Sequence, residues 1–172
     1  MAVSLSIYDN SYIDLARKFE VDPSSCDNPI HYNEFLMYNA DLDYNKGLGV
    51  TYILVDDDKD AIIAYMTLKA SALTYSDGND KILGKPAVEI AELAVSKNYK
   101  GQGYGRELVE YAIAKIHELK EIIGVQYLVL CADPMAAGFY EHLKIQKLTS
   151  NDIPREDWNK NCIPMGKKII IY

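Results

Sequence analysis

The sequence has 172 residues, of which 49% are hydrophobic and 25% are charged. This balance is typical of a globular chain and excludes a disordered or collagen-like protein, and the length favours a single domain over residues 1–172. The formal net charge of -7 has the wrong sign for a protein whose main task is to grip phosphate backbones, because such binding depends on Lys and Arg. We therefore expect no stable complex with nucleic acid.

The sequence also lacks the usual signs of a membrane protein or a secreted protein. No apolar run reaches the roughly 18 residues that a membrane helix needs, and residues 1–9 lack the features of a secretory signal. The cysteines, Cys26, Cys131 and Cys162, are odd in number, far apart and without a C-x-x-C pair. They argue against a disulfide framework and a structural zinc site. We expect a cytoplasmic protein that binds neither a membrane nor a metal.

The first half of the chain predicts two helices followed by a pair of strands. Apolar spacing predicts a helix over 10–20 and a second, shorter helix over 31–41. β-branched and aromatic residues predict a strand over 51–55, with its partner strand over 61–73. The acidic cluster 56–60 between them lacks the glutamate that closes a calcium-binding loop, so we interpret it as a solvated hairpin turn.

The second half predicts a strand–helix–strand–helix centre, and hence a mixed α/β fold. The apolar segment 87–95 predicts a strand, and residues 106–123 predict an amphipathic helix that stops at Gly124. The later elements, in chain order, are a buried strand over 126–131, a helix from the N-cap Asp133 to about Leu143, and closing strands over 146–148 and 167–172.

Three alternating glycines, Gly101, Gly103 and Gly105, stand between the strand 87–95 and the long helix. A P-loop needs Lys and Ser or Thr after its glycines, and a dinucleotide fingerprint needs G-x-G-x-x-G, so neither pattern fits. The segment fits [Q/R/K]-x-x-G-x-G, with Lys100 in the first position. There the glycines let the backbone approach a pyrophosphate, which the N–H groups at the helix start face. A tight turn without a ligand is the alternative, but such a turn rarely needs three glycines.

Two segments resemble the GNAT superfamily of N-acetyltransferases. E-I-A-E-L-A-V-S-K-N-Y-K-G-Q-G-Y-G-R-E-L-V (89–109) resembles its acetyl-CoA signature, and D-P-M-A-A-G-F-Y-E-H-L-K-I (133–145) resembles its second landmark. The usual Gly-Phe after the tyrosine is replaced by Lys144-Ile145 here. The resemblance implies a mixed sheet of six to seven strands flanked by helices, whose fourth and fifth strands splay apart. It also implies an enzyme that moves the acetyl group of acetyl-CoA to a primary amine by direct attack.

The resemblance assigns contacts with acetyl-CoA to specific residues of this chain. The backbone of 93–95 would bind the pantetheine arm, residues 102–106 the pyrophosphate, and the segment 133–139 the thioester end. The candidate cofactor-binding residues are Leu93, Ala94, Val95, Lys100, Gly101, Gln102, Gly103, Tyr104, Gly105, Arg106, Asp133, Ala137 and Phe139.

Three residues are candidates for proton transfer. Tyr140 matches the family tyrosine that gives a proton to the departing CoA thiolate. An alkyl amine has a pKa of about 10, so a base must take its proton before it attacks. Glu89 and Glu92 lie on one strand and face opposite sides, so only one can face the acceptor. Glu89 matches the base glutamate of the histone-acetylating branch and Glu92 is the second choice, while a solvated surface carboxylate is the alternative for each. Cys131 at the end of an apolar strand is more often inert core than a nucleophile.

We expect the acceptor to be the amine of a small molecule or polypeptide, with the amine of an aminoacyl-tRNA as the alternative. C-D-N-P, T-Y-I-L, Y-M-T-L and I-P-M are similar to the toxin branch of GNATs, which acetylates the amine of aminoacyl-tRNA and is held by a small antitoxin. The acidic composition favours instead the amine of a small molecule or polypeptide. A non-catalytic acyl-CoA-binding domain is a third reading, against which Tyr140 counts. A homodimer is a further expected assembly. The loops expected to contact the acceptor are the segments 31–49 and 73–86.

Overall fold

The computed structural model describes residues 2–79, 81–149, 152–153 and 161–169. Trp158 and the end of the predicted last strand, 170–172, lie outside these residues. The chain divides into two compact units, a first unit of Met1–Lys69 and Ala91–Glu110 and a second unit of Ala70–Ile90 and Tyr111–Tyr172. The expectation of a single domain over 1–172 stays a prediction.

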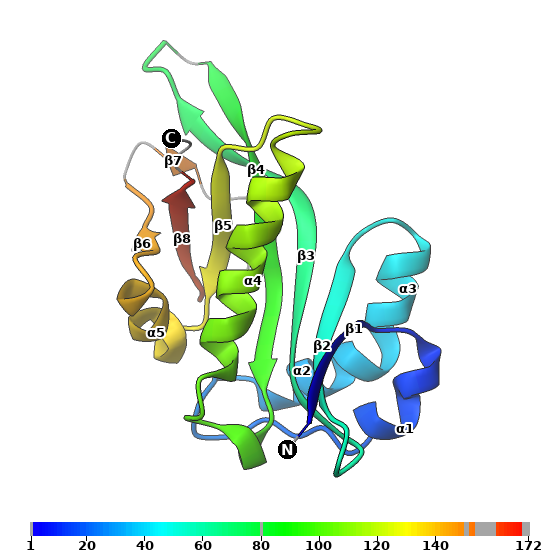
Figure 1. The fold of residues 1–172 in the computed structure, drawn as a ribbon. Helices are drawn as coiled ribbons and strands as arrows, with labels where there is room; N and C mark the ends of the chain where they lie inside the picture. The colour runs from blue at the N-terminus through cyan, green and yellow to red at the C-terminus, as the bar shows by residue number, and fades with distance from the viewer. Residues whose placement is uncertain (1, 80, 150–151, 154–160, 170–172) are drawn as a thin grey trace. The chain divides into compact units, whose positions relative to one another are not determined.

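The first unit contains an antiparallel arrangement of strands, β1 (Val3–Ile7), β2 (Val50–Asp56) and the first part of β3 (Ala61–Ser76) (Figure 1). The register pairs Val3 with Asp56 in β1–β2, and β2–β3 is a hairpin that pairs Asp56 with Ala61. Both predicted strands of the hairpin are confirmed. β1 was not predicted, although its sequence V-S-L-S-I alternates, because its apolar residues are on the exposed face rather than on the inner one.

Short helical segments connect β1 to β2. They are the 3-10 turn η1 (Asn10–Tyr12), α1 (Ile13–Ala16), α2 (Pro29–Glu34), the π-helical turn η2 (Phe35–Asn39) and α3 (Ala40–Asn45). The predicted helix over 10–20 therefore ends early, at Ala16. The predicted helix over 31–41 begins early and ends late. Pro29 suits the first helical position, and the Asn28 side chain caps the helix by accepting a hydrogen bond from the N–H of His31.

The core of the first unit is built around aromatic rings. Tyr65 is fully buried and packs against Phe19, edge to face, and against Phe35, in a stacked arrangement, with centroids 5.3 Å and 6.1 Å away. Its hydroxyl donates a hydrogen bond to the carbonyl oxygen of Tyr32 at 2.8 Å, so the polar tip of a buried ring is satisfied. The ring of Tyr65 thereby ties α2 to β3.

The acidic turn is only partly as predicted, because Asp56 is fully buried. Its Oδ2 accepts a 2.8 Å hydrogen bond from the hydroxyl of Tyr99. Burial acts to raise the pKa of Asp56, but the Tyr99 hydrogen bond and the charge of Lys59 outweigh it and the pKa is lowered. Burial and the same hydrogen bond raise the pKa of Tyr99 to about 12. The remaining residues of the turn, 57–60, are exposed as expected.

The second unit contains the parallel pair of the sheet. β4 (Ile82–Val95), which continues into the first unit, pairs parallel with β5 (Tyr127–Ala132) over Ala87–Ile90. A parallel pair needs a crossover, and α4 (Tyr104–Leu119) supplies it. β5 and β6 (Gln146–Lys147) both pair antiparallel with β8 (Ile163–Lys168), and β7 (Asp152–Ile153) pairs with the end of β3.

Neighbouring strands follow the order β1-β2-β3-β4-β5-β8-β6, with β7 off this path (Figure 1). The predicted mixed α/β sheet is confirmed, with the parallel β4–β5 pair at its centre and β7 as an additional short strand. The β4–β5 ladder ends at the pair Ile90–Leu130, although β4 continues to Val95 and β5 to Ala132. The ladder therefore stops short of both strand ends, as the family resemblance implies.

Three predicted boundaries in this half of the chain are wrong. The last strand, predicted over 167–172, begins earlier, at Ile163, and ends at Lys168. The segment 73–86, expected as an acceptor loop, consists mostly of the ends of β3 and β4, which extend farther than the apolar pattern shows. The long helix ends at Leu119, not at Gly124, because the N–H groups of Ile122 and Ile123 turn back to the carbonyl oxygen of Leu119. Ile123 is accordingly 61% exposed instead of lying on the buried face.

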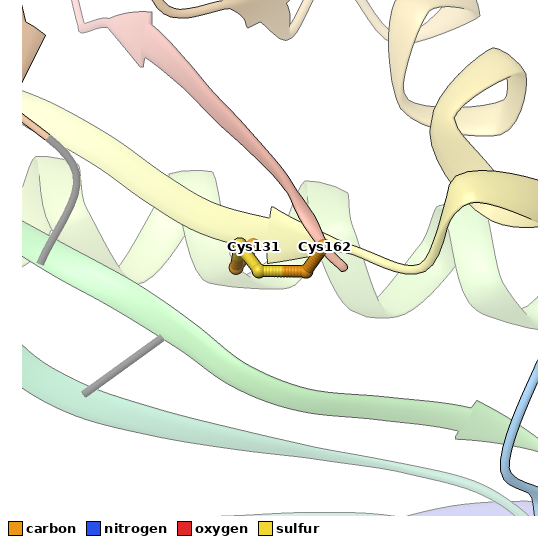
Figure 2. The surroundings of a disulfide bond; sticks show 2 residues. All are labelled: Cys131 and Cys162. Atoms are coloured by element: carbon orange, nitrogen blue, oxygen red, sulfur yellow. A yellow bond between two sulfur atoms is a disulfide. The ribbon is translucent and has the colours of Figure 1, made fainter. Parts of the chain in front are cut away.

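A disulfide joins Cys131, near the end of β5, to Cys162, directly before β8 (Figure 2). The Cα atoms are 5.4 Å apart, a distance typical of a disulfide. The register explains the pairing, because Ala132 lies opposite Ile163, so Cys162, the residue before β8, comes close to the end of β5. The predictions of no disulfide and of an inert Cys131 thiol are therefore wrong.

No helix within the described ranges is long and apolar enough to cross a membrane.

Candidate active site

The glycine loop forms the entry to α4 in the first unit. After a 3-10 turn over Lys97–Tyr99, Gly101 and Gly103 adopt φ values of +78° and +93°. These left-handed conformations are costly for residues with a Cβ, which explains the glycines. A Cβ placed at either position would meet no atom within 4 Å. The backbone is thus open at both glycines, so a pyrophosphate can approach it closely.

The first turn of α4 supplies hydrogen-bond donors beside these glycines. The carbonyl oxygen of Gly103 accepts the N–H of Glu107 at 3.1 Å, so the helix ladder begins there. The preceding N–H groups, of Tyr104, Gly105 and Arg106, belong to the turn whose donors have no acceptor within a helix. α4 has 16 residues, and its amino end carries the positive end of the helix dipole. The loop therefore has the donors that a pyrophosphate needs, and its role as the pyrophosphate site stays a prediction.

The basic side chains of the loop are paired with carboxylates. The Nζ of Lys100 lies 2.6 Å from an oxygen of Asp22, and the Nε of Arg106 lies 2.7 Å from an oxygen of Glu110. The hydrogen bond from Lys100, followed by those from Ser24, lowers the pKa of Asp22 to about 2. An anion at this loop would therefore be bound mainly by backbone N–H groups rather than by unpaired Lys or Arg side chains. Gln102 makes only a long contact, 3.4 Å, with the carbonyl oxygen of Asn98.

The end of β4, also in the first unit, leads directly into this loop. Ala94 is buried in the core of that unit, whereas Leu93 and Val95 are half-buried. The ladder between β4 and β5 ends at Ile90, before this segment. Backbone N–H and C=O groups at 93–95 are the ones that the pantetheine arm would take as hydrogen-bond partners.

Tyr140 lies in the second unit, on α5 (Ala137–His142). The 3-10 turn η4 (Pro134–Ala136) precedes α5, and the Asp133 side chain caps η4 by accepting the N–H of Met135 at 2.9 Å. Tyr140 is buried, with 6% of the residue exposed, and the centroid of its ring lies 4.9 Å from that of Phe139. Ala137 is buried on the same helix, so the second predicted landmark folds as one structured unit.

The turn after α5 forms despite the change from Gly-Phe to Lys144-Ile145. Lys144 adopts a φ of +62°, the left-handed conformation for which glycine is the usual residue. Ile145 is completely buried, and its N–H donates to the carbonyl oxygen of Tyr140 at 3.1 Å. The backbone of this chain therefore keeps the turn, at the cost of strain at Lys144.

Neither candidate base is a solvated surface carboxylate, which corrects that alternative. Glu89 lies in the second unit, is 6% exposed and sits opposite Val129 in the β4–β5 register. Glu92 lies in the first unit with its side chain 15% exposed, and its Oε1 is 3.0 Å from the Nε2 of His31 on α2. Both carboxylates are thus held by the fold.

His31 is the residue near the candidate site that the sequence did not reveal. It is 61 positions from Glu92 and belongs to no motif, so only the packing of α2 against β4 brings the two together. Among the described residues, no group of three or more His, Cys, Asp or Glu side chains gathers as metal ligands would.

Solved structures of acetyltransferase toxins are similar to this fold. A tyrosine-to-phenylalanine mutant of the AtaT toxin, bound to acetyl-CoA and to the C-terminus of the antitoxin AtaR, matches with a TM-score of 0.72 and 19% identity, over 97% of this chain and 93% of that chain. A mutant of KacT matches with a TM-score of 0.76 and 17% identity, over 98% and 96%. AtaT complexed with acetyl-methionyl-tRNAfMet matches with a TM-score of 0.70 and 18% identity, over 95% and 94%.

The sequence itself matches the model of the acetyltransferase (GNAT) family over residues 13–144, more than half of the chain. This span includes the end of β4, the glycine loop, α4, β5 and α5. The family that the two sequence landmarks implied is confirmed, and with it an enzyme that uses acetyl-CoA as acetyl donor. The chain belongs to the GNAT acetyltransferase family.

Proposed function

We propose that the protein transfers the acetyl group of acetyl-CoA to the α-amine of an aminoacyl-tRNA, and that a small antitoxin protein restrains it. The observation that carries this proposal is the likeness to AtaT and KacT over at least 95% of this chain and 93% of theirs. One of these structures holds acetyl-methionyl-tRNAfMet, and another holds an antitoxin segment. The toxin-like segments of the sequence support the same acceptor.

The first unit would hold the donor. The open backbone at Gly101 and Gly103 and the first-turn N–H groups of α4 would bind the pyrophosphate. The backbone at 93–95 would hydrogen-bond the pantetheine arm. Acetyl-CoA, when bound, supplies the activated acetyl group as a thioester. The carbonyl carbon forms a bond to the acceptor nitrogen and loses its bond to sulfur.

Two side chains would move the protons, a carboxylate and the phenol of Tyr140. A carboxylate takes a proton from the attacking amine, for which Glu89 is the first candidate and Glu92, in the first unit, the second. Tyr140 donates its phenolic proton to the sulfur of the leaving CoA thiolate and regains a proton from solvent. Burial of Tyr140 at 6% exposure limits competition from bulk water for that hydroxyl.

The experiment is transfer of a labelled acetyl group from acetyl-CoA to methionyl-tRNA, with uncharged tRNA and free methionine as parallel acceptors. Label on charged tRNA that leaves with the amino acid when the ester is hydrolysed supports the proposal. Growth arrest on expression without a partner supports the restraint by an antitoxin. Absence of label on a panel of charged tRNAs contradicts the tRNA acceptor.

A second candidate acceptor is the amine of a small molecule or polypeptide, which the charge of the chain favours. The net charge is -7, and Lys97, Lys100 and Arg106 near the glycine loop are engaged by Glu20, Asp22 and Glu110. Few cations are thus left near the loop for tRNA phosphates. Label on free amines, with none on charged tRNA, supports this candidate. A homodimer stays a prediction under both.

A further inference from the structure

We infer that His31 and Glu92 form a carboxylate–imidazole pair in which the imidazole accepts the proton of the acceptor amine. The inference rests on the proposed function, because it names the base for acetyl transfer to that amine. It replaces Glu89 in this role and turns Glu92 from a direct base into a positioning residue.

The two residues come from separate elements of the first unit. The Nε2 of His31 on α2 lies 3.0 Å from the Oε1 of Glu92 on β4. The Asn28 cap fixes the start of α2, and the ring of Tyr32 lies edge-on to the His31 ring at 5.3 Å. The imidazole is therefore held in place by its helix, a neighbouring ring and the carboxylate.

The exposure of the pair suits proton transfer to an external acceptor. The side chain of Glu92 is 15% exposed, whereas that of His31 is 48% exposed. The carboxylate is shielded enough for its charge to act strongly on the ring, and the ring is open enough for an amine to reach it. Glu92 also stands directly before 93–95, the β4 segment proposed to bind the pantetheine arm.

The charges around the imidazole favour its protonated form. The hydrogen bond to Glu92 raises the pKa of His31, burial acts in the opposite direction, and the charges of Glu92 and Glu34 add to the rise. Burial, followed by the charge of Glu92, raises the pKa of Tyr65 well above its ordinary value. Tyr65 is therefore neutral, and Glu92 on β4 and Glu34 on α2 are the charged groups that act on His31.

In this arrangement the two ring nitrogens of His31 have different roles. With the Nε2–H of His31 donated to Glu92, the Nδ1 lone pair is the basic site of the ring. The amine nitrogen forms its bond to the acetyl carbon as its proton moves to Nδ1 and the carbon–sulfur bond breaks. Glu92 stabilises the imidazolium that results, as a carboxylate does in a Ser-His-Asp triad. The imidazolium then releases the proton to solvent.

The test compares pH profiles of kcat/KM for the acceptor amine in wild type, His31→Gln and Glu89→Gln, with acetyl-CoA saturating. Gln at position 31 can still donate to Glu92 but does not titrate. Because the base must be neutral, wild-type kcat/KM should rise as the pH climbs through the raised His31 pKa. We expect His31→Gln to lower kcat/KM by about 10²–10⁴-fold and to lose this rise, with an unchanged Kd for acetyl-CoA. Added imidazole should restore part of the rate in His31→Ala.

His117→Gln on the exposed side of α4 is the matched control and should keep both the rate and the profile. If the rise of kcat/KM with pH persists in His31→Gln and is lost in Glu89→Gln, the inference is overturned. The proposed acetyltransferase activity itself is not contradicted by that result. A wild type that acetylates no amine overturns the proposed function instead. NMR titration then still examines the pair, since His31 should titrate above its ordinary pKa in wild type and lower in Glu92→Gln. Equal values in both proteins overturn the pair.

Discussion

Tyr140 combines the two properties that a proton donor to a thiolate needs. The residue is 6% exposed and therefore lies in the packed interior, and it sits on α5, directly after the turn η4 that Asp133 caps. The neighbouring ring of Phe139, 4.9 Å away, limits the positions that the Tyr140 ring can take. A phenol held in this way can donate without reorganising its surroundings.

Tyr140→Phe should therefore separate catalysis from binding. The substitution removes one hydroxyl and keeps the ring that packs against Phe139, so we expect kcat to fall by about 10²–10⁴-fold with little change in the Kd for acetyl-CoA. Steady-state kinetics and calorimetry measure the two quantities. Tyr111→Phe on α4, which also removes one phenolic hydroxyl but at a position outside the candidate site, is the control. Full turnover in Tyr140→Phe would mean that the residue is only part of the core.

Lys144 carries strain that a glycine would relieve. Its φ of +62° costs about 1–3 kcal/mol for a residue with a Cβ, whereas glycine pays about 0.5–1 kcal/mol in lost chain entropy. Lys144→Gly should thus raise the free energy of unfolding by about 0.5–1 kcal/mol, measured by urea denaturation. Lys144→Ala keeps the Cβ and should give no such gain. Equal stabilities of the Gly and Ala variants would refute the strain.

For single residues, the sequence can suggest a role that depends on the neighbouring residues of one motif. It does not show which distant residues the fold brings together. Tyr140 is found from its neighbours in A-A-G-F-Y alone. The pair of His31 and Glu92 is separated by 61 positions, and neither residue is unusual in its local sequence. Cys131 and Cys162 are 31 positions apart, and only the β5–β8 register shows that they meet.

The left-handed glycines of the loop between β4 and α4 should be needed for the binding of acetyl-CoA. Gly103→Val places a β-branched residue at a φ of +93°, so the backbone must change where it faces the pyrophosphate. We expect the Kd for acetyl-CoA to rise by about tenfold or more, which is about 1.4 kcal/mol. Gly78→Val is the matched control, because Gly78 has a φ of +83° and equally open surroundings in the β3–β4 turn. An unchanged Kd in folded Gly103→Val, measured by calorimetry, would remove the pyrophosphate from this loop.

The disulfide links β5 to β8 and closes a loop with a sequence separation of 31. By the chain-entropy relation such a bond stabilises the folded state by about 3–4 kcal/mol. We expect a reducing agent to lower the urea midpoint of wild type by the corresponding amount and to leave that of Cys162→Ser unchanged. Cys26→Ser, which keeps the disulfide, should respond as wild type does. The disulfide would be contradicted if the urea midpoint of wild type did not change on adding the reductant and all three cysteines reacted as free thiols before it was added.

Element types were more predictable than element ends. The hairpin β2–β3, the strand before the glycine loop, α4 and β5 all follow from apolar periodicity. Their ends follow from contacts that periodicity does not contain. β3 and β4 extend into the segment 73–86 as neighbouring strands of the sheet, and β3 also pairs there with β7. α4 stops at Leu119 because a local turn uses its carbonyl oxygen as acceptor.

The charge of the whole molecule limits how it can handle tRNA. With a net charge of -7 and the loop cations paired to acids, few phosphate contacts are available. For about two such contacts, raising monovalent salt from about 50 to 200 mM should raise the KM for charged tRNA by roughly tenfold. The KM for a small free amine should change little over the same range. A salt-independent KM for tRNA would exclude phosphate contacts from recognition.

Acetyl transfer from acetyl-CoA that requires an amine acceptor is the central activity expected of this protein. The direct measurement is the rate of CoA thiol release with a panel of acceptors that includes charged tRNA, uncharged tRNA, free amino acids and polyamines, compared between wild type and Tyr140→Phe. We predict that thiol release by wild type accelerates with charged tRNA, matches the acetylated product mole for mole, and falls by about 10²-fold or more in the variant. Binding of acetyl-CoA with no acceptor-dependent thiol release, or equal release by the two proteins, would contradict the account.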